Sequence, residues 1–313
     1  MYRSIVVPLD GSPSAEFAVP VARGIARRTD GGVHLVHVHV PLSVAGALRS
    51  ATVPFYRDWE VEAKSQEEDY LSGLQQRLSG LPQVSVDHRL EEGSVVDTLV
   101  RCASELSGDL IVMTTHGRGP LARAWLGSVA DGVARRSAVP VLLLRPTADA
   151  EPIGEHLFRN ILVTLDGSPL AEQILEHVTG LGALSGARYT LARVVSPMVV
   201  TGYAPTPEGM LTDSAHGAEL EMLVADAEAY LEGVAAMLRS RGLSVETQVV
   251  VELQTAVGIL DFAREKAVDL IAMATHGRTG FSRLVLGSVA DKVLRGTTAP
   301  VLLYRPLQGV SAG

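Results

Sequence analysis

Short apolar runs recur along the chain, and a segment with helical spacing separates each from the next. In the first half these runs are five to seven residues long, contain many β-branched side chains, and span residues 5–9, 33–38, 84–90, 110–114 and 139–144. Most are continuously apolar rather than alternating, which is typical of strands covered on both faces. The pattern therefore predicts buried parallel strands.

The segments between the runs have the apolar spacing of amphipathic helices. One example has apolar residues at i, i+3, i+4 and i+7: Ala171, Ile174, Leu175 and Val178. Gly-Ser-Pro at residues 11–13 and 167–169 predicts a serine N-cap followed by proline at the first helical position. Pro20 predicts a kinked or shortened first helix, because proline lacks the backbone N–H.

The whole pattern is present twice. The segment DLIVMTTHGRGPLARAWLGSVADGVAR begins at Asp109, and DLIAMATHGRTGFSRLVLGSVADKVLR begins 160 residues later, at Asp269. Near the start of each copy, IVVPLDGSPSAE from Ile5 matches ILVTLDGSPLAE from Ile161 at an offset of 156 residues. Four extra residues therefore enter the second copy, and the change of offset places them after its second strand.

The duplication predicts two tandem domains. Alternating strands and helices favour a doubly wound α/β domain with a five-stranded parallel sheet and right-handed crossovers in each copy. The expected domains are residues 1–146 and 159–308. The linker, residues 147–158, contains proline, glycine and acidic residues that interrupt the periodicity.

Composition and charge limit the classes of partner. The 313 residues carry a net charge of −8, and no basic cluster is longer than two residues, so no nucleic-acid binding is expected. No apolar run approaches the ~20 residues that span a bilayer, and the N-terminal residues lack a signal-peptide core, so we expect a cytoplasmic protein without membrane contact. The single cysteine, Cys102, is expected to be buried and unreactive.

Each copy contains a glycine loop between an apolar strand and a helix. In both copies nine residues separate two glycines, and a serine follows the second: Gly117, Gly127 and Ser128, then Gly277, Gly287 and Ser288. Glycines let backbone N–H groups approach an anion, and a helix N-terminus adds donors and partial positive charge. The loop therefore indicates a phosphate cradle. Alternatively, Ser-x-x-Asp at 128–131 and 288–291 forms capping boxes that need no ligand.

Two further polar positions recur beside the loop. Asp10 and Asp166 end the first strand of each copy, where a carboxylate accepts hydrogen bonds from a base amino group or a ribose hydroxyl. The alternative is an Asx turn in Asp-Gly-Ser. His116 and His276 flank the glycine loop, and we expect them to anchor it rather than act as general bases.

A metal site or a covalent active site is not expected. His37 and His39 share a strand face with ligand-like spacing, but the second copy has Arg193 and Val195 at these positions. The chain contains no G-x-x-x-x-G-K-S/T P-loop and no G-x-S-x-G nucleophile elbow.

These residues resemble the universal stress protein family in its tandem two-domain form. The motifs that carry the resemblance occur in both copies: Thr-His-Gly-Arg, the nine-residue spacer, Leu-Gly-Ser-Val-Ala-Asp and Pro-Val-Leu-Leu-x-Arg-Pro. The resemblance implies a Rossmann-like fold with strand order 3-2-1-4-5 and an adenine nucleotide such as ATP, with any Mg²⁺ arriving with the nucleotide. It also implies that the closing strands pair, so that the two domains pack as an internal pseudo-dimer.

The family's binding positions carry over residue by residue. Its adenine, ribose and phosphate positions, the first loop glycine and the helix start fall in the first copy on Pro8, Asp10, Val38, Thr114, Gly117, Gly127, Ser128 and Val129. In the second copy they fall on Thr164, Asp166, Val194, Ala274, Gly277, Gly287, Ser288 and Val289.

Two positions depart from the family pattern. The first loop glycine is Thr114 in one copy and Ala274 in the other, and β-branched threonine brings more bulk to this close approach. We therefore expect both sites to bind, with the second loop the better phosphate binder.

Two classes of function remain open. The first is a nucleotide-responsive stress protein that transmits occupancy to an unknown protein partner, as a monomer or a homo-oligomer. The second is a partner-binding protein whose loops no longer take nucleotide. Slow ATP hydrolysis is the most that we expect of enzyme activity, because phosphoryl transfer needs a positioned metal and a group that orients water.

Overall fold

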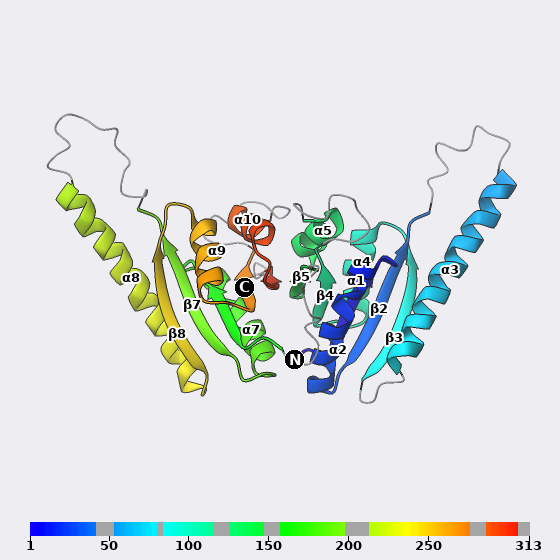
Figure 1. Ribbon diagram of the computed structural model, residues 1–313, viewed down its shortest axis with the longest axis horizontal. Coiled ribbons are helices and arrows are strands. Elements are labelled where there is room, and N and C mark those ends of the chain that lie inside the picture. The colour runs from blue at the N-terminus through cyan, green and yellow to red at the C-terminus, as the bar shows by residue number, and fades with distance from the viewer. Residues whose placement is uncertain are drawn as a thin grey trace, which may run out of the picture. The chain divides into compact units, whose positions relative to one another are not determined.

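The computed structural model describes residues 1–41, 53–79, 84–115, 126–146, 157–197, 213–275 and 286–305 (Figure 1). The chain divides into two compact units, Met1–Leu157 and Phe158–Gly313, each with five strands.

The first unit is a five-stranded parallel sheet between helices. Its strands are β1 (Ser4–Leu9), β2 (Gly32–His39), β3 (Ser85–Glu92), β4 (Leu110–Thr114) and β5 (Val141–Leu144). Its helices are α1 (Pro13–Glu16), α2 (Ala18–Thr29), α3 (Val53–Ser79), α4 (Val95–Glu105) and α5 (Ser128–Arg136). The strand order β3-β2-β1-β4-β5 confirms the order implied by the resemblance.

The second unit repeats this architecture. Its strands are β6 (Asn160–Thr164), β7 (Arg188–Val195), β8 (Ser244–Val251), β9 (Leu270–Ala274) and β10 (Val301–Tyr304). Its helices are α6 (Pro169–Glu172), α7 (Ile174–Gly182), α8 (Asp213–Ser240), α9 (Thr255–Glu265) and α10 (Ser288–Gly296). The order β8-β7-β6-β9-β10 is the same as in the first unit.

In each unit, successive strands are added on one side of the first strand and then on the other, so the strand order reverses there. In the first unit, β1 pairs with β2 on one side and with β4 on the other. Right-handed crossovers then place α2 and α3 on one face of the sheet and α4 and α5 on the other. This switch point leaves a crevice at the carboxyl ends of the strands, where ligands bind in open α/β sheets.

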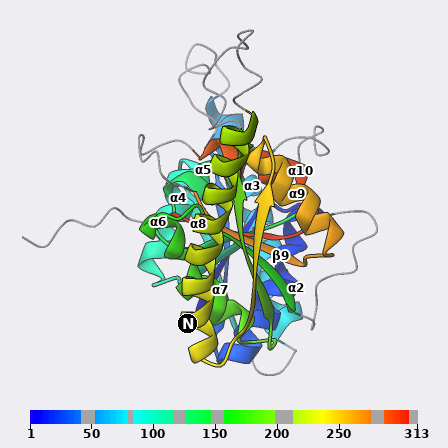
Figure 2. The same cartoon turned by 90° about the vertical axis from the view of Figure 1, so that its left-hand side faces the viewer.

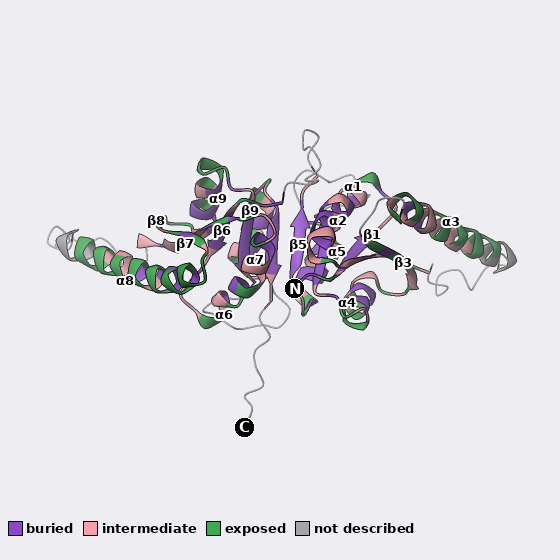
Figure 3. Ribbon diagram, turned by 90° about the horizontal axis from the view of Figure 1, so that it is seen from below, coloured by how far each residue is buried: buried purple, intermediate pink, exposed green. Residues whose placement is uncertain are grey.

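The core of each unit consists of the strands and the inner faces of the helices. In the first unit Ile5 pairs with Val33 and with Leu110, and all three side chains are at most 1% exposed. Figure 3 shows central strands such as β5 as buried and the outer faces of the helices as exposed. Burial on both faces explains why the central strands are continuously apolar in sequence. The outer strands β3 and β8 are mostly half-buried or exposed, so the expectation of a buried strand at residues 84–90 is wrong.

The first helix of each unit begins as the sequence predicts. The Ser12 hydroxyl accepts the Ala15 N–H at 3.1 Å, and Ser168 does the same for Ala171 at 3.1 Å. Each helix is interrupted one turn later, at Phe17 and at the equivalent residue of the second unit.

The interruption does not come from Pro20, so that prediction is wrong. The second unit breaks at Gln173 and has no proline in the helix that follows. Pro20 is the third residue of α2, in a first turn whose N–H groups have no partner within the helix. Its missing N–H therefore costs no helical hydrogen bond.

The long helices α3 and α8 follow the segments of unequal length. Thirteen residues separate β2 from α3, and 17 separate β7 from α8, which agrees with the predicted insertion of four residues. Figure 2 shows α8 running lengthwise beside β8. Neither α3, α8 nor any other described helix has an apolar stretch that could cross a membrane.

Candidate nucleotide-binding crevices

Each unit has a crevice at the carboxyl ends of its strands. The first has a volume of about 880 Å³, and Pro8, Asp10, Val38, Thr114, Gly127, Ser128 and Val129 all line it. The second has a volume of about 220 Å³, and Thr164, Asp166, Val194, Ala274, Gly287, Ser288 and Val289 line it. The structure thus gathers the described candidate residues of each copy in one place. Gly117 and Gly277, with His116 and His276, lie outside the described residues.

The aspartate at the end of each first strand closes a turn. Asp10 Oδ1 accepts the Ser12 N–H at 2.9 Å, and Gly11 has a φ of 77°, a left-handed conformation that glycine adopts without strain. Asp166 accepts the Ser168 N–H at the same distance, 2.9 Å. The Asx-turn interpretation therefore describes the local geometry. Both carboxylates also line their crevices.

The helix after the glycine loop starts one residue earlier than a capping box requires. Gly127 is the N-cap of α5, Ser128 is the first helical residue, and no side chain caps the helix. Asp131 instead accepts a hydrogen bond from Arg135 Nε at 2.8 Å. The capping-box alternative is therefore wrong. The N-cap glycine has no side chain to cap the first turn, and the first residues of α5 line the crevice, an arrangement that favours an anion.

The second glycine of the loop also has a structural role. The Gly127 N–H donates to the Thr115 carbonyl at 2.8 Å, and the Gly287 N–H donates to the Thr275 carbonyl at 3.0 Å. A Cβ added at Gly287 would lie 2.6 Å from the Thr275 carbonyl oxygen, closer than van der Waals contact allows. This glycine is therefore needed for the close approach of the helix start to the end of β9.

Thr114 does not close the first crevice. It lies at the end of β4, is 7% exposed, and lines the larger of the two cavities. Ala274, with the smaller side chain, lines the smaller cavity. The size of each cavity therefore does not follow the bulk of this side chain, and the expectation that the second loop is the better phosphate binder stays a prediction.

Helix α3 forms one wall of the first crevice, which no sequence motif predicts. Five residues of α3 line it: Trp59, Ala63, Gln66, Glu67 and Tyr70. They are 20 or more positions away from every motif, and their helical periodicity is the same as that of any surface helix. The one available signal is the pair of histidines on β2, whose spacing indicates only a metal site that the second copy does not share.

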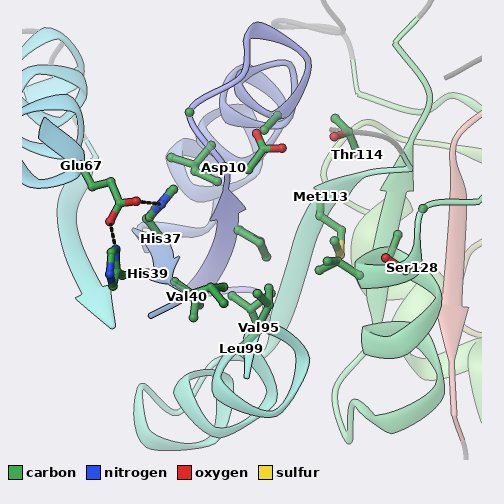
Figure 4. Close-up of a pocket in the computed structure, with 18 of the residues that line it drawn as sticks. Asp10, His37, His39, Val40, Glu67, Val95, Leu99, Met113, Thr114 and Ser128 are labelled. Atoms are coloured by element: carbon green, nitrogen blue, oxygen red, sulfur yellow. Dashed lines mark hydrogen bonds and ion pairs between the residues drawn. The ribbon is translucent and has the colours of Figure 1, made fainter. Parts of the chain in front are cut away.

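His37 and His39 bind to carboxylates of α3 rather than to a common metal position. His39 Nδ1 lies 2.8 Å from Glu67 Oε2, and His39 Nε2 lies 2.9 Å from Glu60 Oε1. His37 Nε2 lies 3.4 Å from the other oxygen of Glu67 (Figure 4). We call His37, His39, Glu60 and Glu67 the β2–α3 clamp.

The clamp favours a charged His39. Burial lowers the pKa of His39, but the hydrogen bonds with Glu60 and Glu67 outweigh it and raise the pKa above its ordinary value of 6.5. Both ring nitrogens then donate to carboxylates, which only the imidazolium form can do. The clamp therefore couples β2, which lines the crevice, to α3, which walls it.

Among the described side chains, one cluster has metal-ligand spacing, and its two carboxylates are already paired with an arginine. Glu91, Cys102 and Glu105 lie within 4.8 Å of one another. Arg101 bonds to Glu91 at 2.9 Å and to Glu105 at 2.8 Å, so its guanidinium already neutralises the two carboxylates. Burial raises the pKa of the Cys102 thiol. Cys102 is fully buried, as the sequence predicts.

Comparison with known proteins identifies close similarity to one family. The sequence profile of the Universal stress protein family matches residues 1–145 and 157–305. A universal stress protein of Mycolicibacterium smegmatis is 25% identical over 307 residues, which cover 96% of this chain and 97% of that protein. Universal stress protein MJ0531 of Methanocaldococcus jannaschii is 30% identical over 154 residues, or 49% of this chain and 85% of its own length.

A solved structure shows the same fold along nearly the whole chain. The crystal structure of a universal stress protein from Archaeoglobus fulgidus DSM 4304 superimposes with a TM-score of 0.68 and 18% sequence identity. The match covers 97% of this chain and 99% of that one.

Proposed function

Because the chain belongs to the universal stress protein family, we propose that it binds ATP or a related adenine nucleotide as a regulatory ligand in a stress response. The crevice of the first unit is the site. The observation that carries the proposal is that seven family-motif positions, from four separate segments of the chain, line one cavity of about 880 Å³. That volume lies within the range of about 300–1,000 Å³ that ligand pockets occupy.

The described residues divide the site into two ends. At one end, the uncapped start of α5 at Gly127 and Ser128 offers backbone N–H groups to phosphates. At the other, Asp10 and the backbone around Val38 offer hydrogen-bonding groups to the ribose and the base, with Val95 and Leu99 as apolar walls. This arrangement of polar and apolar groups supports the proposal.

The arrangement supports binding rather than rapid hydrolysis. Among the described residues that line the first crevice, the carboxylates are Asp10 and Glu67. Asp10 closes the turn after β1, and Glu67 holds His39. Both carboxylates already hold a neighbouring group in place, whereas phosphoryl transfer requires a positioned metal and a group that orients the attacking water. We therefore propose that occupancy, not turnover, is the signal that a protein partner detects.

The test is direct. Purified protein is denatured and the supernatant is examined for adenine nucleotide, and ATP binding to ligand-free protein is measured by calorimetry. We expect Asp10→Ala to weaken ATP binding roughly 10- to 100-fold, the range for a hydrogen bond to a charged group. Asp69→Ala, an exposed carboxylate on α3, is the matched control and should bind as the native chain does. Absence of released nucleotide together with absence of ATP binding would refute the proposal.

The second candidate function is partner binding without nucleotide. The observation that favours it is Thr114, a β-branched residue at the first glycine position of the family loop. Thr114→Gly distinguishes the two functions. If the native chain does not bind ATP and this variant does, the loop has lost its competence through this side chain.

A further inference from the structure

The two crevices differ about fourfold in volume, although their motif residues correspond one to one. We infer that the chain binds a single nucleotide, in the first unit, and that Arg193 closes the second crevice on its α8 side. This inference rests on the proposed function. It specifies how many nucleotides one chain binds and which of the two crevices binds them.

The difference lies on the face of the sheet that α3 or α8 covers. The first crevice reaches across the end of β2 to His37, Glu67 and Tyr70. Among its described lining residues, the second crevice has none from α8. It is confined to the ends of the strands and to α6, α9 and α10. The missing volume is therefore the space between β7 and α8.

Arg193 occupies the position of His37 and spans that space. Its guanidinium lies 3.4 Å from Asp226 and 5.5 Å from the ring centre of Tyr230, both on α8. The Arg193 side chain is only 12% exposed although it is long and charged. An arginine stacked over an aromatic ring is attracted to the negative face of that ring. The side chain is thus held across the gap rather than extended into solvent.

Tyr230 shows the consequence. Its counterpart in the first unit, Tyr70, lines the crevice, whereas Tyr230 is covered by Arg193. The Tyr230 hydroxyl donates to Glu172 Oε1 at 2.9 Å, which fixes the ring against α6. Leu223 stands at the position that corresponds to Ala63, a lining residue of the first crevice, and has the larger side chain.

In the first unit a shorter side chain leaves the space open. His37 reaches α3 only through its 3.4 Å contact with Glu67, and the Tyr70 ring remains part of the cavity wall. Figure 4 shows His37 and His39 on the same side of the crevice, each joined to Glu67, with Asp10 and Ser128 across the opening. The second crevice, at about 220 Å³, falls below the range of about 300–1,000 Å³ that ligand pockets occupy.

The experiment counts and locates bound nucleotide in the full chain. ATP is titrated by calorimetry to give the number of equivalents, and 8-azido-ATP is crosslinked and the labelled peptides are mapped. We expect one equivalent, with labelled peptides from residues 1–157 only. Two equivalents, or labelling in residues 158–313 of the native chain, would overturn the inference.

A variant tests the role assigned to Arg193. The double variant Arg193→His and Leu223→Ala gives the second unit the residues that the first unit has at these positions. It should raise the number of bound ATP equivalents from one to two, with new labelling in the second unit. Arg188→His, an exposed arginine at the other end of β7, is the control and should remain at one. A folded double variant that stays at one equivalent would refute the role of Arg193. Absence of any ATP binding to the native chain would instead refute the proposed function, and the inference with it.

Discussion

His39 Nδ1 lies 2.8 Å from Glu67 Oε2, and this contact joins the strand that lines the first crevice to the helix that walls it. The second unit has Val195 and Ala227 at these positions, and its helix is held by Arg193 instead. The two units share one fold, but they attach their equivalent long helices, α3 and α8, through different side chains. The first attachment depends on a histidine held by carboxylates, and the second depends on an arginine stacked on an aromatic ring.

The first prediction concerns the pH dependence of the β2–α3 clamp. Since the pKa of His39 is raised on folding, its contribution to stability is fully present below the unfolded pKa of 6.5 and is lost as pH rises through the folded pKa. We expect backbone amides of α3 to exchange faster at pH 8.5 than at pH 6, after correction for intrinsic exchange rates. Hydrogen–deuterium exchange of α3 and α8 in one sample measures this, and α8 is the internal control.

The same clamp predicts the effect of a substitution. His39→Gln keeps hydrogen-bonding capacity but removes the charge, and we expect a loss of about 1–3 kcal/mol in stability of the first unit at pH 6. The loss should shrink at pH 8.5, because the native histidine is then less protonated. The charged groups around the ring are Glu60, Glu67 and Lys64 on α3 and Glu92 on β3. A loss that is the same at both pH values would contradict the assignment of charge to His39.

Gly287 should not tolerate a side chain. Gly287→Ala places a Cβ 2.6 Å from the Thr275 carbonyl, and we expect it to destabilise the second unit by about 1–3 kcal/mol, as overpacking does. Gly233→Ala, in the middle of α8 with open space around it, is the control. It should stabilise the helix by up to about 1 kcal/mol. Urea unfolding of both variants provides the comparison.

The serine caps should contribute equally in the two units. Ser12→Ala and Ser168→Ala each remove an acceptor for an N–H at 3.1 Å, and we expect each to cost about 1 kcal/mol. Thermal unfolding measures both. The serine-to-glycine variants serve as the check, since glycine at an N-cap costs only a few tenths of a kcal/mol. Equal losses for alanine and glycine would show that the hydroxyl is not acting as a cap.

The sequence alone determined the duplicated α/β fold and most of the motif residues at the crevices. Strand positions such as Ile5 and Leu110 are buried on both faces, and that environment selects continuous apolar runs that are visible in any single sequence. The Ser12 cap is equally local, because it depends on a few consecutive residues.

Only the tertiary structure decided what the two crevices look like. The pairing of His39 with Glu67 and the stacking of Arg193 on Tyr230 join residues 28 and 37 positions apart, from elements that meet only after the sheet has formed. A side chain's reach across such a gap depends on the distance between strand and helix, which periodicity does not encode. The sequence therefore presents two equivalent sites, whereas packing makes one of them large and the other small.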